Sequence, residues 1–179
     1  MNAALPEHYR STIRTLIRYS IVLLALGLLS GVAFQESSKK LDYAEIAAGA
    51  RLEAVLSLAL VHGHMLVTGV LMPLALAAAL DLAHRSGGAE LSVRSLRWLT
   101  RGYLPCVSAT LALMLYKGYH TLLSVRFGAR DFDAIDAAYF GGLVPLRHAV
   151  YGIVHVGMAI ALGVFGVALW RSVNSTRPH

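Results

Sequence analysis

Eight histidines occur in a chain of 179 residues, of which 56% are hydrophobic and only 15% are charged. Five of the eight fall inside long apolar stretches, where an ionisable side chain is costly unless it has a partner or a function. These five are His62, His64, His120, His148 and His155. Neutral imidazole is a ligand for haem iron and for copper and zinc ions. The histidines therefore indicate a site for haem or for a metal ion.

All five histidines are predicted to lie in one half of the membrane. Counted from the outer end of its apolar stretch at about 1.5 Å per helical residue, His64 lies roughly 15 Å deep and His155 roughly 13 Å deep. His120 and His148 lie within roughly 3–6 Å of the outer boundary. We therefore expect His64 and His155 to share one layer of a helical bundle, where imidazoles on two helices can face each other.

His62 and His64 point to different sides of their helix, because two residues turn an α-helix by about 200°. His64 falls on a polar stripe with Glu53, Ser57 and Thr68, which we expect to face the interior of the bundle. The opposite side is typical of a helix-packing face, and it consists of Ala59, His62, Met65, Leu66 and Gly69. We therefore expect His64, rather than His62, to pair with His155.

The leading interpretation is a haem b site with His64 and His155 as the two axial ligands. Haem propionates need cations or hydrogen-bond donors, and the outer half of the bundle supplies both. The candidates are Lys117, Arg147, Tyr116 and Tyr119, together with Tyr151 on the same helix face as His155. We expect Gly152 and Gly157 to let the porphyrin approach the helix backbone. Such a protein would transfer electrons, or sense or handle a small gas, near the outer membrane face.

Two other interpretations stay open. His62, His120 and His148, which would otherwise surround the haem or form a second site, can instead bind copper or zinc. The histidines can also serve only as interhelical hydrogen-bond partners in a structural or accessory subunit. The sequence holds no hydrolase triad, phosphate-binding loop or dinucleotide fingerprint. If the protein is an enzyme, we therefore expect a haem or metal oxidoreductase, or a subunit of one.

Four apolar stretches position these residues, at about 17–34, 54–82, 98–125 and 146–170. A helix needs roughly 20 residues to cross the hydrocarbon layer of a bilayer. Lipid offers no hydrogen-bond partners to the backbone, so these stretches must be helical. We predict an all-α, polytopic membrane protein in which residues 1–179 form a single four-helix transmembrane bundle.

Small residues and prolines predict further features of the helices. Gly27 and Gly31 are spaced for close packing of the first helix on a neighbour. Pro73 and Pro105 predict kinks in the second and third helices. The Ala-rich segment from Leu41 to Glu53 predicts a short helix at the membrane surface.

The positive charge is concentrated on one side of the predicted bundle. The two chain ends and residues 81–101, which include the inner loop 84–97, hold nine arginines and three acidic residues, which accounts for the whole formal net charge of +6. Basic residues favour the cytoplasmic side, so both termini are predicted to be cytoplasmic, with 35–53 and 126–145 outside. This distribution favours a lipid bilayer, not nucleic acid, as the surroundings of the basic residues. We also expect a redox partner or a second copy of the chain.

The second apolar stretch contains the segment HGHMLVTG, from His62 to Gly69, and three further short segments lie at 27–39, 114–118 and 152–155. In order along the chain, they resemble an uncharacterised bacterial family of small four-helix membrane proteins. The second helix of that family begins with a signature close to H-T-H-L-L-V-L-G. The chain departs from the family at Gly63, at Lys117 and in a longer second outer loop.

The resemblance implies four spans in the bacterial inner membrane, and it singles out His62, His64 and His155. It lends the chain no activity. The H-x-H spacing is also similar to helices of haem–copper oxidases, although those proteins have twelve spans and additional ligands, so this likeness is an analogy only.

Overall fold

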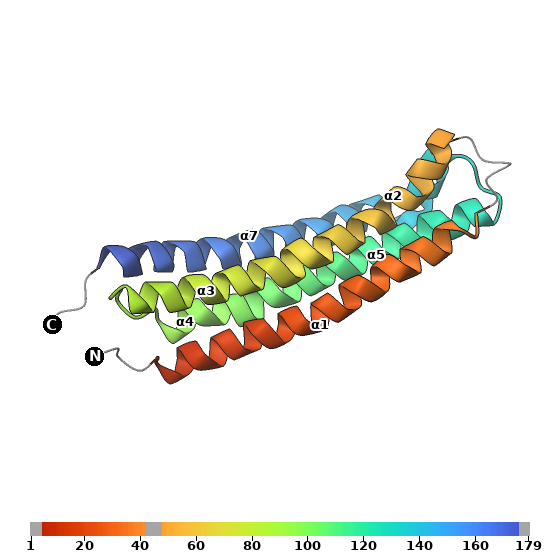
Figure 1. Cartoon of the computed structure of the whole chain (residues 1–179). Helices are drawn as coiled ribbons and strands as arrows, with labels where there is room; N and C mark the ends of the chain where they lie inside the picture. The colour runs from red at the N-terminus through yellow and green to blue at the C-terminus, as the bar shows by residue number, and fades with distance from the viewer. Residues whose placement is uncertain (1–4, 42–47, 176–179) are drawn as a thin grey trace.

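The computed structural model describes residues 5–41 and 48–175, and the regular structure in these ranges is helical throughout. Four long helical segments run side by side in an elongated bundle, and the first and last described residues, 5 and 175, lie at the same end of it (Figure 1). The all-helical prediction is therefore confirmed for the described residues. Arg177, His179 and part of the helix expected over 41–53 lie outside these residues. We call the end at which residues 5 and 175 lie the proximal end and the other the distal end.

Each long segment contains one predicted apolar stretch. The first is α1 (Glu7–Ser38). The second is continuous through α2 (Ala48–His64), η1 (Met65–Leu71) and α3 (Met72–Arg85). The third is continuous through α4 (Val93–Arg97), η2 (Trp98–Tyr103) and α5 (Leu104–Arg126). The fourth is α7 (Val144–Asn174), and α6 (Phe132–Ala138) and η3 (Tyr139–Gly142) precede it at the distal end.

Three helices in the described ranges are long and apolar enough to cross a membrane. They are Glu7–Ser38, Gly49–Arg85 and Val144–Asn174, with 32, 37 and 31 residues. At about 1.5 Å per residue, each exceeds the hydrocarbon thickness of roughly 30 Å. Their outward faces carry large apolar side chains, among them Leu29, Ile153 and Trp170, each more than 60% exposed. Such surfaces fit the acyl chains of a bilayer.

Both prolines expected to kink the helices follow a wider, π-helical turn, η1 before Pro73 and η2 before Pro105. Proline has no N–H, and its ring collides with the preceding helical turn, so a wider turn relieves the clash. The carbonyl of Thr68, which loses its helical donor at Pro73, accepts a hydrogen bond of 2.8 Å from the Tyr103 hydroxyl. This bond joins the second long segment to the third at the distortion.

Glycines set the closest approaches between helices. A Cβ added at Gly31 of α1 would lie 3.0 Å from Nδ1 of His62, and one at Gly27 would lie 3.4 Å from Met65. The predicted close packing of the first helix through these glycines is therefore confirmed. A Cβ added at Gly118 of α5 would lie 2.5 Å from Cδ2 of Leu58 on α2. Large side chains thus fill glycine notches, and this complementarity fixes how α2 is rotated.

Candidate functional site

His64 lies at the end of α2 with its side chain exposed. Its Nδ1 lies 2.8 Å from the carbonyl oxygen of Leu60. A carbonyl can only accept, so Nδ1 carries the proton and donates, and Nε2 is left with its lone pair. Nε2 of His64 is therefore the nitrogen available to a ligand.

His155 on α7 repeats this arrangement. Its side chain is exposed, and its Nδ1 donates to the carbonyl of Tyr151 at 2.8 Å. Nε2 of His155 again keeps its lone pair. A ring N–H held by a backbone carbonyl is the usual state of a histidine that ligates a metal, because the bond fixes both the tautomer and the ring orientation.

The expected inward orientation of the polar stripe on α2 is wrong. Glu53 and His64 are exposed, whereas Leu58, Val61 and Met65 fill the interior. The rotation of α2 follows from the fit of Leu58 into the notch at Gly118. The expected packing face is confirmed, since Met65 and Gly69 are buried and His62 faces α1.

The interhelical contacts show which side of the bundle His64 occupies. On α5, Gly118 meets Leu58 of α2, and Cys106 meets Gly157 of α7. These two positions are about 120° apart around α5. His64 points about 200° away from His62, which faces α1, and so lies on the side of α2 where α7 runs. We call this side of the bundle the lateral face.

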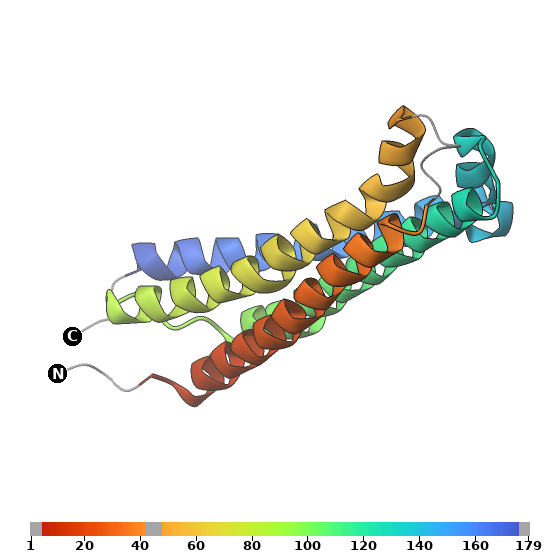
Figure 2. The ribbon, with the colours of Figure 1, turned by 45° about the vertical axis from the view of Figure 1, so that its right-hand side comes forward.

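His155 and His64 lie at similar levels along the bundle. The Leu58–Gly118 and Gly157–Cys106 contacts place residues of α2 and α7 at known levels of α5. Counting along the helices from these contacts places His155 about one turn, or roughly 6 Å, nearer the proximal end than His64. Of the long helices, α2 packs mainly on α1 and α5, while α7 packs on η2 and α5. Figure 2 shows α2 bending away from the other helices toward the distal end. The two imidazoles therefore stand on separate helices, and neither is covered by the described residues.

The other three histidines lie at three different places. Nδ1 of His62 donates to the carbonyl of Gly27 at 2.7 Å, between α2 and α1. Nε2 of His120 donates to the carbonyl of Ile135 at 2.9 Å, beneath α6. His148 is exposed in the first turns of α7. Within residues 5–41 and 48–175, no group of three or more His, Cys, Asp or Glu side chains is placed to hold a metal ion.

Lys117 and Arg147 converge on one carboxylate at the distal end. Nζ of Lys117 lies 3.0 Å from Oδ1 of Asp136, and a guanidinium nitrogen of Arg147 lies 2.7 Å from Oδ2. The hydrogen bond from Lys117, supported by Arg147, holds the pKa of Asp136 below its usual range. Two cations face one carboxylate, so this cluster, which we call the distal clamp, has an excess of one positive charge.

Comparison with known sequences identifies the family. A family model described as "Protein of unknown function (DUF2871)" matches residues 13–172. The chain belongs to this family. No curated protein and no solved structure matches the chain. The expected membership of an uncharacterised family is therefore confirmed, and the description of this family names no ligand or reaction.

In this member of the family, aromatic side chains surround the distal clamp. The Tyr139 hydroxyl donates to the carbonyl of Leu113 at 3.0 Å and lies 3.1 Å from the Tyr151 hydroxyl. Tyr139 is buried, which raises the pKa of its phenol. The Tyr116 ring packs on the rings of Tyr139 and Phe140. Tyr116 and Tyr151 thus belong to one distal cluster, since both contact Tyr139.

Sequence reasoning did not single out Asp136 or Tyr139. Both lie in the segment 126–145, which holds three aspartates and a tyrosine in a short irregular region. Nothing in that segment alone shows which aspartate meets Lys117 and Arg147, because the pairing depends on how α6 folds back over α5. The only signal in the sequence for this pairing was that Lys117 and Arg147 lie on either side of the acidic segment 126–145.

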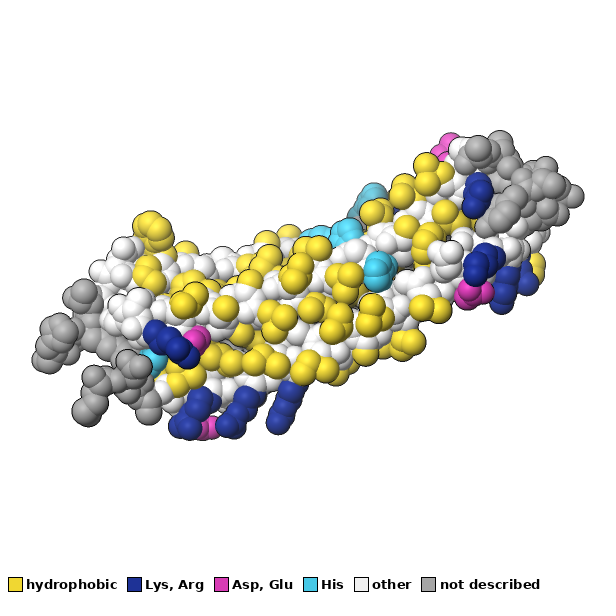
Figure 3. All heavy atoms as spheres, viewed as in Figure 1, with side chains coloured by type: hydrophobic (Ala, Val, Ile, Leu, Met, Phe, Trp, Pro, Cys, Tyr) yellow, Lys and Arg dark blue, Asp and Glu magenta, His cyan; other side chains and the backbone are white. Residues whose placement is uncertain are grey.

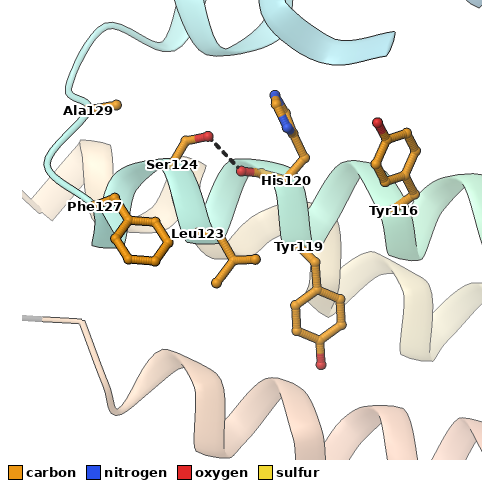
Figure 4. A pocket seen from close by; sticks show the side chains of 7 residues that line it. All are labelled: Tyr116, Tyr119, His120, Leu123, Ser124, Phe127 and Ala129. Atoms are coloured by element: carbon orange, nitrogen blue, oxygen red, sulfur yellow. Dashed lines mark hydrogen bonds between the residues drawn. The ribbon is translucent and has the colours of Figure 1, made fainter. Parts of the chain in front are cut away.

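A shallow pocket of about 540 Å³ lies on the distal half of α5. Its lining is Tyr116, Tyr119, His120, Leu123, Ser124, Phe127 and Ala129. Figure 4 shows Tyr119 and Phe127 on one side of the helix and Tyr116 and His120 on the other. Aromatic side chains in this position are typical of the boundary between lipid and water.

Proposed function

We propose that the protein crosses the bacterial inner membrane four times, with both termini in the cytoplasm. Three of the long segments have the length and hydropathy of membrane spans. The fourth span is α5, which is 23 residues, about 34 Å, long and lies alongside the other helices (Figure 1). The excess of arginine at the proximal end supports the cytoplasmic position of that end.

In this four-span arrangement, the protein would bind haem b at the lateral face, and Nε2 of His64 and Nε2 of His155 would hold the iron. The observation that carries the proposal is the matched tautomer of the two rings, each donating Nδ1–H to a carbonyl of its own helix at 2.8 Å. Two histidines on two helices suffice for haem, whereas a copper or zinc site would need a larger group of ligands.

The surface of α7 beside His155 leaves room for a flat ligand. A Cβ added at Gly152, on the same flank of α7 as His155, would meet no atom within 4 Å, so the helix surface there is open. Gly157 has a different role from the one expected, because it packs against Sγ of Cys106. The cofactor would therefore approach α7 at Gly152.

The distal clamp supplies the charge that propionates need. Lys117 lies on α5 about 100° around the axis from Gly118, toward α7, and about 7 Å distal to the level of His64. Its cluster with Arg147 and Asp136 retains one excess positive charge. A propionate directed toward the distal membrane surface would be balanced there, and Tyr116 and Tyr151 offer further hydroxyl groups.

Bound haem b supplies a one-electron redox couple. The chain's own His64 and His155 would hold the iron, and the carbonyls of Leu60 and Tyr151 orient their imidazoles. Because two histidines would hold the iron and leave no position open, electron transfer is favoured over gas binding. The donor and acceptor would be a membrane redox partner or a second copy of the chain.

Haem content tests this proposal. The wild-type protein and the variants His64→Ala, His155→Ala and His148→Ala would be produced with haem supplementation and purified in detergent. We expect the first two variants to lose at least about tenfold in haem content, while His148→Ala keeps the wild-type content, since His148 acts at most through the surroundings of the cofactor. Equal haem content in all four proteins would contradict the axial assignment.

A further inference from the structure

A second pocket lies at the proximal end, far from the lateral face. It has a volume of about 210 Å³ and lies between α1 and the segment α4–η2. Its lining is His8, Ser11, Thr12, Thr15, Val93, Leu96, Arg97, Thr100 and Arg101. Two hydrogen bonds to the backbone of Leu91 fix one wall of this pocket. Nε2 of His8 donates to the Leu91 carbonyl at 3.3 Å, and the Leu91 N–H donates to the Tyr9 hydroxyl at 2.6 Å.

The polar groups that line this pocket are donors. Arg97 and Arg101 contribute two guanidinium groups, and no acidic side chain lines the pocket. The hydroxyls of Thr12 and Thr15 already donate to carbonyls of their own helix, at 2.9 and 3.0 Å. The Ser11 and Thr100 hydroxyls make no hydrogen bond to other described residues, so both can donate to a ligand. Such a set suits an anion with several oxygens, such as a phosphate.

Most of the surrounding arginines have no carboxylate partner in the described part of the chain. Of the three acids at this end, Glu7 and Asp81 pair with Arg10 and Arg85, and the exposed Glu90 forms no ion pair with a described arginine. No such ion pair engages the remaining arginines of this region, which are Arg14, Arg18, Arg94, Arg97 and Arg101. Figure 3 shows the dark-blue side chains in a row along α1 at this end. The region therefore attracts anions, and Arg97 and Arg101 are free to hold one.

A neighbouring pocket connects this site to the membrane surface. It has a volume of about 240 Å³, and its lining is Arg94, Arg97, Trp98, Arg101 and Gly102. Trp98 is 38% exposed, as tryptophans at the headgroup level commonly are. Along α1, the exposed apolar side chains of Val22 and Leu26 lie on the same helix face as the pocket residues and continue that face toward the distal end. A ligand with a phosphate and acyl chains would fit both the arginine pocket and the apolar helix surface next to it.

We propose that these two pockets form a binding site for the headgroup of an anionic phospholipid, with its phosphate between Arg97 and Arg101. Its acyl chains lie on the apolar surface of α1. A lipid is favoured over a free phosphate ion because Trp98 and the apolar helix faces would contribute nothing to a free ion. This site is independent of the haem proposal, since it shares no residue with the lateral face.

Lipid binding to the purified full-length protein tests the site. The protein in neutral detergent would be titrated with phosphatidylglycerol and, separately, with phosphatidylcholine, and bound lipid would be counted by native mass spectrometry. Inorganic phosphate would be added as a competitor. We expect saturable binding of phosphatidylglycerol that millimolar phosphate does not displace, and much weaker binding of phosphatidylcholine.

Three variants locate the binding to this pocket. Arg97→Gln should weaken phosphatidylglycerol binding about five- to tenfold. Thr100→Val, which keeps every charge and nearly the same shape, should weaken it about threefold. Arg171→Gln is the matched control, because Arg171 is exposed in the last turn of α7 and lines neither pocket. It removes one positive charge and should leave binding unchanged.

The proposal is overturned by any of three results. Equal loss in Arg97→Gln and Arg171→Gln would mean only general attraction to charge. Displacement of the lipid by phosphate would mean a free-anion site. Unchanged lipid binding in Thr100→Val would mean that the lipid does not bind in this pocket. This result can be obtained even if Arg97→Gln fails to fold.

Discussion

The two histidines of the H-x-H segment have separate tasks in the structure. His62 is partly buried between α2 and α1 and donates to the carbonyl of Gly27, whereas His64 is exposed and bonds only within its own helix. One residue therefore holds two helices together, and the other presents a free Nε2 at the lateral face. We therefore expect a change at His62 to affect mainly the stability of the protein, and a change at His64 to affect mainly cofactor binding.

Alanine substitutions test this separation. We expect His62→Ala to lower the free energy of unfolding by about 1 kcal/mol, because an interhelical hydrogen bond and its packing are lost, and to leave haem bound. We expect His64→Ala to lose haem and to leave the stability of the cofactor-free protein unchanged. Thermal unfolding in detergent and haem content would be measured for both. If His62→Ala abolished haem binding while His64→Ala retained it, the assigned roles would be reversed.

Helix rotation could not be read from the sequence, although helix position could. The four apolar stretches predicted the long helices because their length is a local property of the sequence. The polar stripe gave the wrong rotation of α2, because rotation depends on which large side chain meets which glycine on another helix. Leu58 meets Gly118, which is 60 residues away in the chain. The same limit hid the pairing of Lys117 with Asp136.

The notch at Gly118 should be the most sensitive glycine position in the described helices. A Cβ there would lie 2.5 Å from Cδ2 and 3.2 Å from the backbone nitrogen of Leu58, so α2 and α5 must separate. We expect Gly118→Ala to destabilise the protein by about 1–3 kcal/mol. The control is Gly163→Ala on α7, where a Cβ would meet no atom within 4 Å. Equal thermal unfolding of the two variants would show that the α2–α5 packing is not set at this notch.

The distal clamp should make stability depend on pH. Since Lys117 and Arg147 lower the pKa of Asp136 in the folded protein, its stabilising effect is present above the unfolded carboxyl pKa, about 4, and is lost as the pH falls through the folded value. We expect Asp136→Asn to be less stable than wild type at pH 7, and the difference to shrink as the pH falls below about 4 and to vanish only below the lowered pKa of Asp136 in the folded protein. A difference that did not shrink at all as the pH was lowered from 7 through 4 would mean that the charge of Asp136 contributes nothing.

At the scale of the whole molecule, the proposed orientation places the proximal and distal ends on opposite sides of the membrane. In a Cys106→Ala background, Glu90→Cys lies at the proximal end and Ala134→Cys lies in α6. We expect a membrane-impermeant thiol reagent to label position 134 in cells whose inner membrane is intact and accessible, and to label position 90 only after the membrane is opened. The reverse pattern would overturn the orientation.

The two ends of the molecule would then serve different partners. The proximal end, with its arginines and Trp98, would meet anionic headgroups on the cytoplasmic side. The distal half would hold the cofactor below the clamp of Lys117, Arg147 and Asp136. An electron carried by the haem would be exchanged near the outer surface of the membrane.

The visible spectrum of the wild-type protein, purified in detergent after expression with haem supplementation, decides whether this arrangement holds a cofactor. With His64 and His155 as ligands on both sides of the iron, we expect a Soret band and, after reduction, a sharp low-spin α band. A protein that is folded and helical by circular dichroism but shows no Soret band under these conditions would contradict the haem proposal.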